Sequence, residues 1–227
     1  MTARIVRDDA EGRAAAIEVL RAGGIVALPT DTVYGLAVAL GTPGGIERLF
    51  EAKRRLPDKG IMLLLDTVAQ AGAIGVMGPA AMALAGACWP GGLTVVVQQR
   101  PDVPLPAVLT GGAPTIGLRV PDHATPRSLA AAVGPLPTTS ANVSGLPEAG
   151  DSAAILAQLG DAIDLILDGG PAHGGPASTV VDCSGARPVI LREGAIPTSR
   201  VARILDAAGV AHEARSRQRG PTPRRTK

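Results

Sequence analysis

The 227-residue sequence predicts a single α/β domain in which helices pack against one mixed sheet. Short apolar runs of strand length alternate with longer stretches of helical periodicity along most of the chain. Hydrophobic residues make up 46% of the sequence, which is ample for one core at this length. No internal repeat interrupts the pattern, so we expect one domain over residues 1–210 and a basic tail, expected to be disordered, over residues 211–227.

The predicted elements follow one another at short intervals. The expected strands cover residues 26–28, 61–65, 93–97, 115–120, 136–140, 164–167, 179–182 and 189–192. The expected helices cover residues 9–22, 42–55, 67–74, 79–88, 126–133, 152–159 and 199–208. Residues 100–114 hold four prolines and two glycines, which predicts an irregular surface loop.

Capping residues, glycines and prolines set the ends of the first elements. Asp8 or Asp9 can cap the first helix, and Gly23–Gly24 ends it. Pro29 cannot donate a hydrogen bond to a sheet, so the strand before it ends there. Thr42–Pro43 predicts the start of the second helix, because threonine is a good N-cap and proline suits the first helical position.

The charge and the aromatic content narrow the class of protein. Residues 215–227 carry six Lys or Arg and no acid, which leaves 16 basic and 20 acidic residues in the body of the chain. The whole sequence has one Trp, one Tyr and one Phe, too few for a typical platform that stacks the bases of single-stranded RNA. The basic tail could still make a weak, salt-sensitive contact with tRNA.

The sequence also bears on location. No apolar stretch approaches the roughly 20 residues needed to span a bilayer, and acids occupy the place of a signal peptide's apolar region. We therefore expect a cytoplasmic protein without membrane contact. Cys88 and Cys183 have no second Cys or His at metal-ligand spacing, which favours two ordinary thiols. The three histidines are too scattered to indicate a zinc site.

Three hydrogen-bonding residues, Thr30, Asp31 and Thr32, directly follow the strand that ends at Pro29. Open α/β sheets bind ligands beyond the ends of their strands, so these side chains are candidate ligand contacts. Thr and Asp are also good turn formers, and a capped turn without a ligand explains the same residues.

A second candidate is the cation-rich segment over residues 53–59, which contains Lys53, Arg54, Arg55 and Lys59. Arginine offers paired hydrogen bonds and lysine a mobile charge, so the segment suits a polyphosphate. The alternative is a solvated helix end, since a helix C-terminus favours cations in any case.

Further polar and charged residues stand in or next to apolar strands. The segment Thr-Thr-Ser-Ala-Asn-Val-Ser-Gly at 138–145 could cradle a phosphate or ribose, or form a turn without a ligand. Arg119 and Arg192 each need an anionic partner, either from the protein or from a ligand. The sequence contains no Walker-type loop, no Gly-x-Gly-x-x-Gly fingerprint and no His-based triad.

Seven motifs occur in order along the chain. They are Pro-Thr-Asp-Thr-Val-Tyr-Gly-Leu at 29–36, Lys-x-Arg at 53–55, Trp-Pro-Gly-Gly-Leu-Thr at 89–94, Leu-Arg-Val-Pro-Asp-His at 118–123, Ser-Ala-Asn-x-Ser-Gly at 140–145, Ser-Thr-Val-Val-Asp at 178–182 and Leu-Arg-x-Gly at 191–194. Together they resemble the YrdC/TsaC-like threonylcarbamoyl-AMP synthases of the short, single-domain type, over roughly residues 10–205.

This resemblance implies a nucleotidyltransferase, L-threonylcarbamoyladenylate synthase. Such an enzyme joins L-threonine, bicarbonate or CO2 and ATP, and releases pyrophosphate. Its product supplies the N6-threonylcarbamoyladenosine of tRNA, to which a separate transferase complex moves the group. The implied fold is a twisted, open α/β sheet with a concave, partly basic cavity. ATP is then a substrate, and Mg²⁺ is expected with its phosphates.

The resemblance also assigns residues, motif by motif. It implies that threonine is bound by Thr32, Arg119, Thr138 and Ser178. It implies that ATP is bound by Lys53, Arg55, Lys59, Thr115, Ser140, Asn142 and Arg192. Lys53 and Arg55 would be catalytic, because they would stabilise the charge that develops on the phosphates. No general base and no metal ligand are assigned.

The chain departs from the usual family pattern at a few positions, and two other classes stay open. Leu56 and Gly60 stand where prolines are usual, and Leu64 stands where longer relatives often have a histidine that contacts threonine. An RNA-binding module is disfavoured by the mildly acidic body. A carbamoyl-adenylating domain, like that of hydrogenase maturation factors, is disfavoured because zinc-finger and acylphosphatase-like parts are missing from the sequence.

Overall fold

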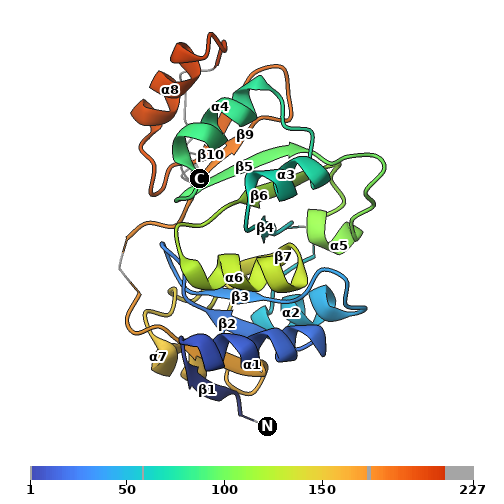
Figure 1. Ribbon diagram of the computed structural model, residues 1–227, viewed down its shortest axis with the longest axis vertical. Helices are drawn as coiled ribbons and strands as arrows, with labels where there is room; N and C mark the ends of the chain where they lie inside the picture. Colours follow the sequence, from blue (N-terminus) through green and yellow to red (C-terminus); the bar gives the residue numbers. More distant parts are fainter. Residues whose placement is uncertain (1, 58, 173–174, 213–227) are drawn as a thin grey trace, which may run out of the picture.

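The computed structural model describes residues 2–57, 59–172 and 175–212. Its strands form one open, mixed sheet in the order β1-β8-β2-β3-β7-β4-β6-β5-β9-β10 (Figure 1). The strands are β1 (Arg4–Arg7), β2 (Val26–Leu28), β3 (Gly35–Ala37), β4 (Met62–Leu64), β5 (Leu93–Gln98), β6 (Thr115–Arg119), β7 (Leu136–Ser140), β8 (Leu165–Asp168), β9 (Thr179–Asp182) and β10 (Val189–Arg192). Residues 213–227, which make up most of the expected tail, lie outside the described residues.

Helices cover both faces of this sheet (Figure 1). They are α1 (Ala10–Arg21), α2 (Gly45–Lys53), α3 (Val68–Ile74), α4 (Pro79–Cys88), α5 (Ala107–Thr110), α6 (Ala124–Val133), α7 (Ser152–Leu159) and α8 (Thr198–Ala207). Neighbouring residues of one strand point to opposite faces, and Leu63 and Leu64 of β4 accordingly belong to two separate hydrophobic clusters.

The smaller cluster lies beneath α1 and α6, which pack against each other. Leu20 of α1 and Leu129 of α6 are fully buried against strand residues that include Val26, Leu136 and Leu165. The larger cluster fills the opposite face, where α2, α3, α4 and α7 supply most of the helical side chains. Apolar side chains are therefore buried on both faces of the sheet.

Most predicted elements agree with the structure to within one or two residues, but two strands were missed. β1 has only two apolar residues between two arginines, and it lies at the edge of the sheet. β3 holds a glycine and an alanine, which have low strand propensity. Its position comes from its antiparallel partners β2 and β7, and that pairing is a tertiary constraint.

Two helix predictions and one loop prediction need correction. α2 begins at Gly45 rather than at Thr42–Pro43, because Gly44 adopts a left-handed conformation with a φ of 71° that interrupts the turn before it. α6 begins at Ala124, where the side chain of His123 accepts a hydrogen bond from the amide of Thr125. The predicted irregular loop over residues 100–114 contains the short helix α5.

The two cysteines are free thiols, as predicted. Burial raises the pKa of Cys88, and burial together with Asp182 raises the pKa of Cys183 to about 12. Within the described part of the chain, every helix is too short or too polar to cross a membrane.

The segment after β10 approaches the chain before β9 very closely. A Cβ atom at Gly194 would lie 2.0 Å from the carbonyl oxygen of Ala177, so only glycine fits without backbone movement. Thr179 fixes this approach, because its buried hydroxyl accepts hydrogen bonds from the amides of Gly194 and Ile196, each at 2.9 Å. The residues on either side of this contact, including Ser178 and Arg192, are therefore held at a fixed separation.

Gly194→Ala is expected to lower the free energy of unfolding by about 2–3 kcal/mol, because the new methyl group must displace backbone. The measurement is urea denaturation followed by circular dichroism. Gly72→Ala is the matched control: Gly72 is an exposed residue of α3 with open space at its Cβ, and the change is expected to raise stability by about 0.5–1 kcal/mol. Equal effects of the two substitutions would contradict the close approach at Gly194.

Candidate functional site

A cavity of about 340 Å³ lies over the central strands of the sheet. Leu64 belongs both to its lining and to the hydrophobic cluster beneath α1 and α6, so the cavity continues the face that those helices cover. Alternate residues of a strand point to one face, and the lining shows this pattern in β4, β5 and β6. The sheet itself therefore forms the floor of the cavity.

Gly117 keeps the centre of this floor open. It pairs with Met62 of β4 on one side and with Val96 of β5 on the other. A Cβ atom at Gly117 would lie 3.3 Å from Cγ2 of Thr94 and 3.4 Å from Cβ of Met62. A larger side chain at this position would fill the space in which a ligand could lie.

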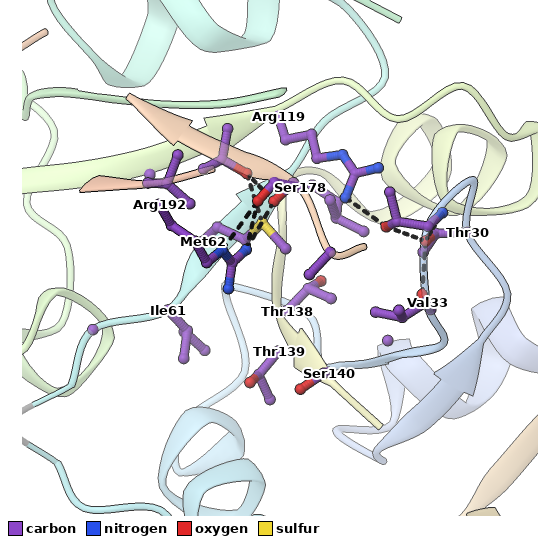
Figure 2. Close-up of a pocket in the computed structure, with 18 of the residues that line it drawn as sticks. Thr30, Val33, Ile61, Met62, Arg119, Thr138, Thr139, Ser140, Ser178 and Arg192 are labelled. Atoms are coloured by element: carbon purple, nitrogen blue, oxygen red, sulfur yellow. Dashed lines mark hydrogen bonds between the residues drawn. The ribbon is translucent and has the colours of Figure 1, made fainter. Parts of the chain in front are cut away.

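The lining combines hydroxyls, arginines and small apolar side chains (Figure 2). It consists of Thr30, Thr32, Val33, Tyr34, Gly35, Arg55, Gly60, Ile61, Met62, Leu64, Thr94, Val96, Thr110, Thr115, Gly117, Arg119, Thr138, Thr139, Ser140, Glu148, Ala177, Ser178, Val180 and Arg192. Its charged members are three arginines and one glutamate.

Arg119 is buried at the inner end of the cavity, with 2% of its surface exposed. Its guanidinium donates to Oδ1 of Asp31 at 2.6 Å, to Oγ1 of Thr32 at 3.0 Å and to the carbonyl oxygen of Gly91 at 2.9 Å. Burial lowers the pKa of Arg119, and the carboxylate of Asp31 opposes that shift. The anionic partner that the sequence required is therefore a protein carboxylate, and the arginine keeps further N–H donors beyond these three.

The loop between β2 and β3 is held by its own hydrogen bonds as well as by Arg119. The hydroxyls of Thr30 and Thr32 lie 3.1 Å apart, and that of Thr30 donates to the carbonyl oxygen of Val33 at 2.7 Å. At the end of the loop, the hydroxyl of Tyr34 donates to the carbonyl oxygen of Gly170 at 2.6 Å. The turn interpretation and the ligand interpretation of this segment are thus compatible, because the turn residues also line the cavity.

Ser178 lies on the opposite wall, beside Arg192 and Met62 (Figure 2). Arg192 donates to the carbonyl oxygen of Ser178 from Nε at 3.1 Å and from Nη2 at 2.8 Å. Its Nη2 also lies 3.3 Å from the hydroxyl oxygen of Ser178. Arg192 is therefore held through a backbone carbonyl, and its side chain remains exposed at the rim of the cavity.

The cavity separates the two predicted sets of contacts by depth. Those predicted to bind threonine all line it and are all buried, with exposures of 5% or less: Thr32, Arg119, Thr138 and Ser178. Those predicted to bind ATP that line it are half-buried or exposed: Arg55, Thr115, Ser140 and Arg192. A small ligand at the bottom and a larger one at the mouth would fit this gradation.

Three predicted residues, Lys53, Lys59 and Asn142, do not line the cavity. The amine of Lys53 is buried, and it donates to the carbonyl oxygens of Ser140 and Asn142 at 2.6 and 2.9 Å. It also lies 3.1 Å from the hydroxyl oxygen of Ser140 and 2.8 Å from Oδ1 of Asn142. Lys53 thus fixes the loop after β7, and its direct contact with a nucleotide stays a prediction.

Arg55 stabilises the turn that carries Lys59. Its guanidinium donates to the carbonyl oxygens of Lys59 and Gly60, both at 2.9 Å, and lies 5.9 Å from the centre of the Phe50 ring. Lys59 is exposed on this turn, close to the cavity in sequence but outside its lining. Of the cation cluster over residues 53–59, only Arg55 lines the cavity in the described part of the chain.

The sequence reasoning did not single out Thr94 or Glu148, and both line the cavity. Thr94 was visible as the last residue of the Trp-Pro-Gly-Gly-Leu-Thr motif, and strand alternation places it with Val96 on the cavity face. Glu148 gave no signal, because it follows the polar segment in an irregular loop and no periodicity indicates where that loop folds. Leu64, which the departures from the family pattern did single out, is fully buried in the lining.

These features define a class of protein: an open α/β sheet with a ligand cavity of hydroxyl and arginine side chains over its central strands. The sequence model of the family of Sua5, YciO and YrdC proteins, which carries the description "Telomere recombination", matches residues 18–194. That match covers well over half of the sequence, and the chain belongs to this family.

Individual relatives cover most of the chain. A Mycobacterium tuberculosis relative (strain H37Rv) is 37% identical over 202 residues, which are 88% of this chain and 92% of the relative. The threonylcarbamoyl-AMP synthase of Bacillus subtilis is 34% identical over 196 residues, which are 85% of this chain but 56% of that enzyme. The crystal structure of Pyrococcus abyssi Sua5 complexed with L-threonine superimposes with a TM-score of 0.83 at 31% identity, over 90% of this chain and 61% of that one.

The buried amine of Lys53 provides a test by pH. Burial, and to a lesser extent the Arg55 guanidinium, lowers the pKa of Lys53 from 10.5 to about 8. Between these values the unfolded chain keeps a proton that the folded chain has lost, so this lysine's contribution to stability increases with pH. We expect the free energy of unfolding of the wild type to rise relative to that of Lys53→Met between pH 8 and pH 10, measured by urea denaturation at constant ionic strength. A difference that does not change with pH would contradict the lowered pKa.

Proposed function

We propose that this protein is an L-threonylcarbamoyladenylate synthase, a nucleotidyltransferase that makes threonylcarbamoyl-AMP and pyrophosphate from L-threonine, bicarbonate or CO2, and ATP. The observation that carries the proposal is the gradation of the cavity, with buried hydroxyls and a buried guanidinium at the bottom and half-buried or exposed arginines at the mouth. Membership of the family supports it, as does the name of the Bacillus subtilis relative.

The inner end of the cavity suits the amino acid. Arg119 has N–H donors beyond those that bind Asp31, Thr32 and Gly91, and its charge would attract the threonine carboxylate. Hydroxyls of Thr32 and Ser178 stand within the same buried region. A buried polar ligand needs such partners, because an unpaired polar group in this environment would be costly.

The mouth of the cavity suits the triphosphate. Arg55, from the segment before β4, and Arg192, at the end of β10, both line it, and Thr115 and Ser140 add hydroxyls. The proposed ATP site also includes Lys53, Lys59 and Asn142. Lys53 and Asn142 are hydrogen-bonded to each other next to Ser140, and Lys59 lies on the turn that Arg55 holds. This division gives Lys53 a positioning role in addition to the charge it brings.

The chemistry requires positioning and charge more than proton transfer. The neutral amine of threonine attacks CO2 and releases one proton to water. An oxygen of the resulting carbamate then attacks the α-phosphorus while the bond to the pyrophosphate oxygen breaks. Negative charge develops on the phosphate oxygens and on the leaving pyrophosphate, where Arg55 and Arg192 would stabilise it. Holding both substrates in one cavity would supply much of the remaining acceleration. We therefore assign no general base.

Magnesium fits the donor set as a companion of ATP. Mg²⁺ is usually held by one or two carboxylates together with substrate phosphates. Glu148 is the sole carboxylate in the cavity lining of the described residues, and its charge acts on the nearby amine of Lys53. When bound, the ion would offset phosphate charge. Glu148 would hold it and would otherwise repel the triphosphate.

The proposal extends to partners that act after the synthase. The adenylate must pass to a transferase that modifies tRNA, and a cytoplasmic location follows from that pathway. The predicted weak contact of the basic tail with tRNA belongs here too, although residues 213–227 lie outside the described part of the chain. Removal of residues 213–227 is expected to leave adenylate synthesis intact.

The direct test is to incubate the purified protein with ATP, L-threonine, bicarbonate and Mg²⁺, and to follow pyrophosphate and the adenylate by chromatography and mass spectrometry. A threonine-dependent adenylate of the mass of threonylcarbamoyl-AMP is expected. Absence of this product with fresh bicarbonate would contradict the proposal. Formation of an adenylate from carbamoyl phosphate instead would favour a carbamoyl-adenylating enzyme.

Arg55→Ala is expected to lower kcat/KM for ATP about 100-fold, because it removes a cation from the developing phosphate charge. Steady-state pyrophosphate release measures this effect. Arg54→Ala is the matched control, since Arg54 is the exposed neighbour of Arg55 and does not line the cavity. It is expected to stay within about twofold of the wild type. Equal losses in both variants would show that Arg55 acts only through the net charge of the segment.

Glu148→Gln is expected to reduce the benefit of Mg²⁺ for ATP binding several-fold, and to leave binding of metal-free ATP unchanged or tighter. Isothermal titration of ATP, with Mg²⁺ and with EDTA, gives both values without turnover. Glu51→Gln, on the exposed side of α2, is the control. The same Mg²⁺ benefit in Glu148→Gln as in the control would contradict this role of Glu148.

A further inference from the structure

Thr94 lies at the bottom of the cavity beside Ser178, and it is not among the residues predicted to bind threonine or ATP. Both side chains are buried, with exposures of 3% and 2%. The hydroxyl oxygens of Thr94 and Ser178 are 2.8 Å apart, and that of Thr94 lies 3.4 Å from Sδ of Met62. Parallel pairing of β5 with β9 sets this separation, because Thr94 is opposite Val180 and Leu93 is opposite Thr179.

The hydroxyl hydrogens of Thr94 and Ser178 can be arranged in two ways. Arg192 can only donate, so Nη2 occupies an acceptor position of the Ser178 hydroxyl. In one arrangement Ser178 donates to Thr94, and Thr94 donates to the sulfur of Met62. In the other, Thr94 donates to Ser178, and the proton of Ser178 is free to point into the cavity.

These arrangements differ little in energy until a strong acceptor is present. A thioether sulfur is a weak hydrogen-bond acceptor, so the hydrogen bond from Thr94 to Met62 costs little to give up. A carboxylate oxygen is a strong acceptor, and hydrogen bonds to ionised groups are about twice as strong as neutral ones. A bound amino-acid carboxylate would therefore select the arrangement in which Thr94 donates to Ser178.

We propose that Thr94 is a positioning residue that orients the Ser178 hydroxyl towards the carboxylate of the amino-acid substrate. The proposal rests on the proposed function, because it takes Ser178 as a contact of threonine. Thr94 acts in this way as a hydroxyl relay: when the amino acid binds, its O–H bond rotates, and its hydrogen bond shifts from Sδ of Met62 to the hydroxyl oxygen of Ser178. No covalent bond is made or broken.

The methyl group of Thr94 keeps the relay in place. Cγ2 of Thr94 faces Gly117, where an added Cβ would lie 3.3 Å away, so the absence of a side chain at Gly117 makes room for it. A β-branched side chain has few χ1 states in a strand, and this contact favours the one that directs the hydroxyl towards Ser178. Serine at position 94 would keep the hydroxyl and lose part of this restraint.

The test compares Thr94→Val, Thr94→Ser and Ser178→Ala, and the double variant Thr94→Val/Ser178→Ala. Thr94→Val keeps the shape and removes the hydroxyl, and it is expected to weaken threonine binding about fivefold, the size of one lost hydrogen bond. The KM for ATP is expected to stay within twofold of the wild type. Thr94→Ser is expected to recover most of the loss. Threonine titration calorimetry and the two KM values give these quantities.

The double variant decides whether Thr94 acts through Ser178. If it does, Thr94→Val will weaken threonine binding less than twofold when Ser178 is already alanine. Losses that multiply in the double variant would overturn the proposal, as would equal rises in KM for threonine and ATP. A wild type that neither binds threonine nor makes the adenylate would overturn the proposed function and this inference together. Failure of the inference alone appears only in the variants.

Discussion

The buried guanidinium of Arg119 is the contact on which the arrangement of the cavity depends. It joins the loop after β2, through Asp31 and Thr32, to the turn before β5, through Gly91. These segments are far apart in sequence, and each lies in one of the family motifs. A buried charge of this kind needs its partners, and removal of one partner from a buried pair typically costs 3–5 kcal/mol. The same side chain therefore holds the fold together and presents positive charge to the cavity.

Lys53 plays a parallel part at the other side of the site. Its buried amine binds the chain at Ser140 and Asn142, so the end of α2 and the loop after β7 form one rigid unit. Arg119 and Lys53 each join motifs that are far apart in sequence. Arg119 also lines the cavity, whereas Lys53 lies outside the lining and holds residues that belong to it. A residue that supports the lining, such as Lys53, affects a ligand through the groups that it positions.

In the proposed reaction, the two substrates lie at different depths of the cavity. The hydroxyls of Thr94 and Thr138 on the sheet floor are buried on paired strands, whereas the arginines at the mouth come from a loop and from the last strand of the sheet order. A small amino acid needs many partners in a dry environment, and a triphosphate needs charge and room. The relay through Thr94 adds that even the orientation of one hydroxyl depends on the neighbouring strand.

The sequence by itself determined the α/β class, most of the helices and strands, and the set of motifs, because hydrophobic periodicity, prolines and caps are local signals. It also indicated that Arg119 needs an anionic partner, but it could not decide between a group of the protein and a ligand. Tertiary structure decided that choice, placed β3 between β2 and β7, put Lys53 behind the cavity wall and brought Thr94 and Glu148 into the lining. These outcomes depend on strand order and register, which join residues across long stretches of chain, and no local pattern encodes such pairings.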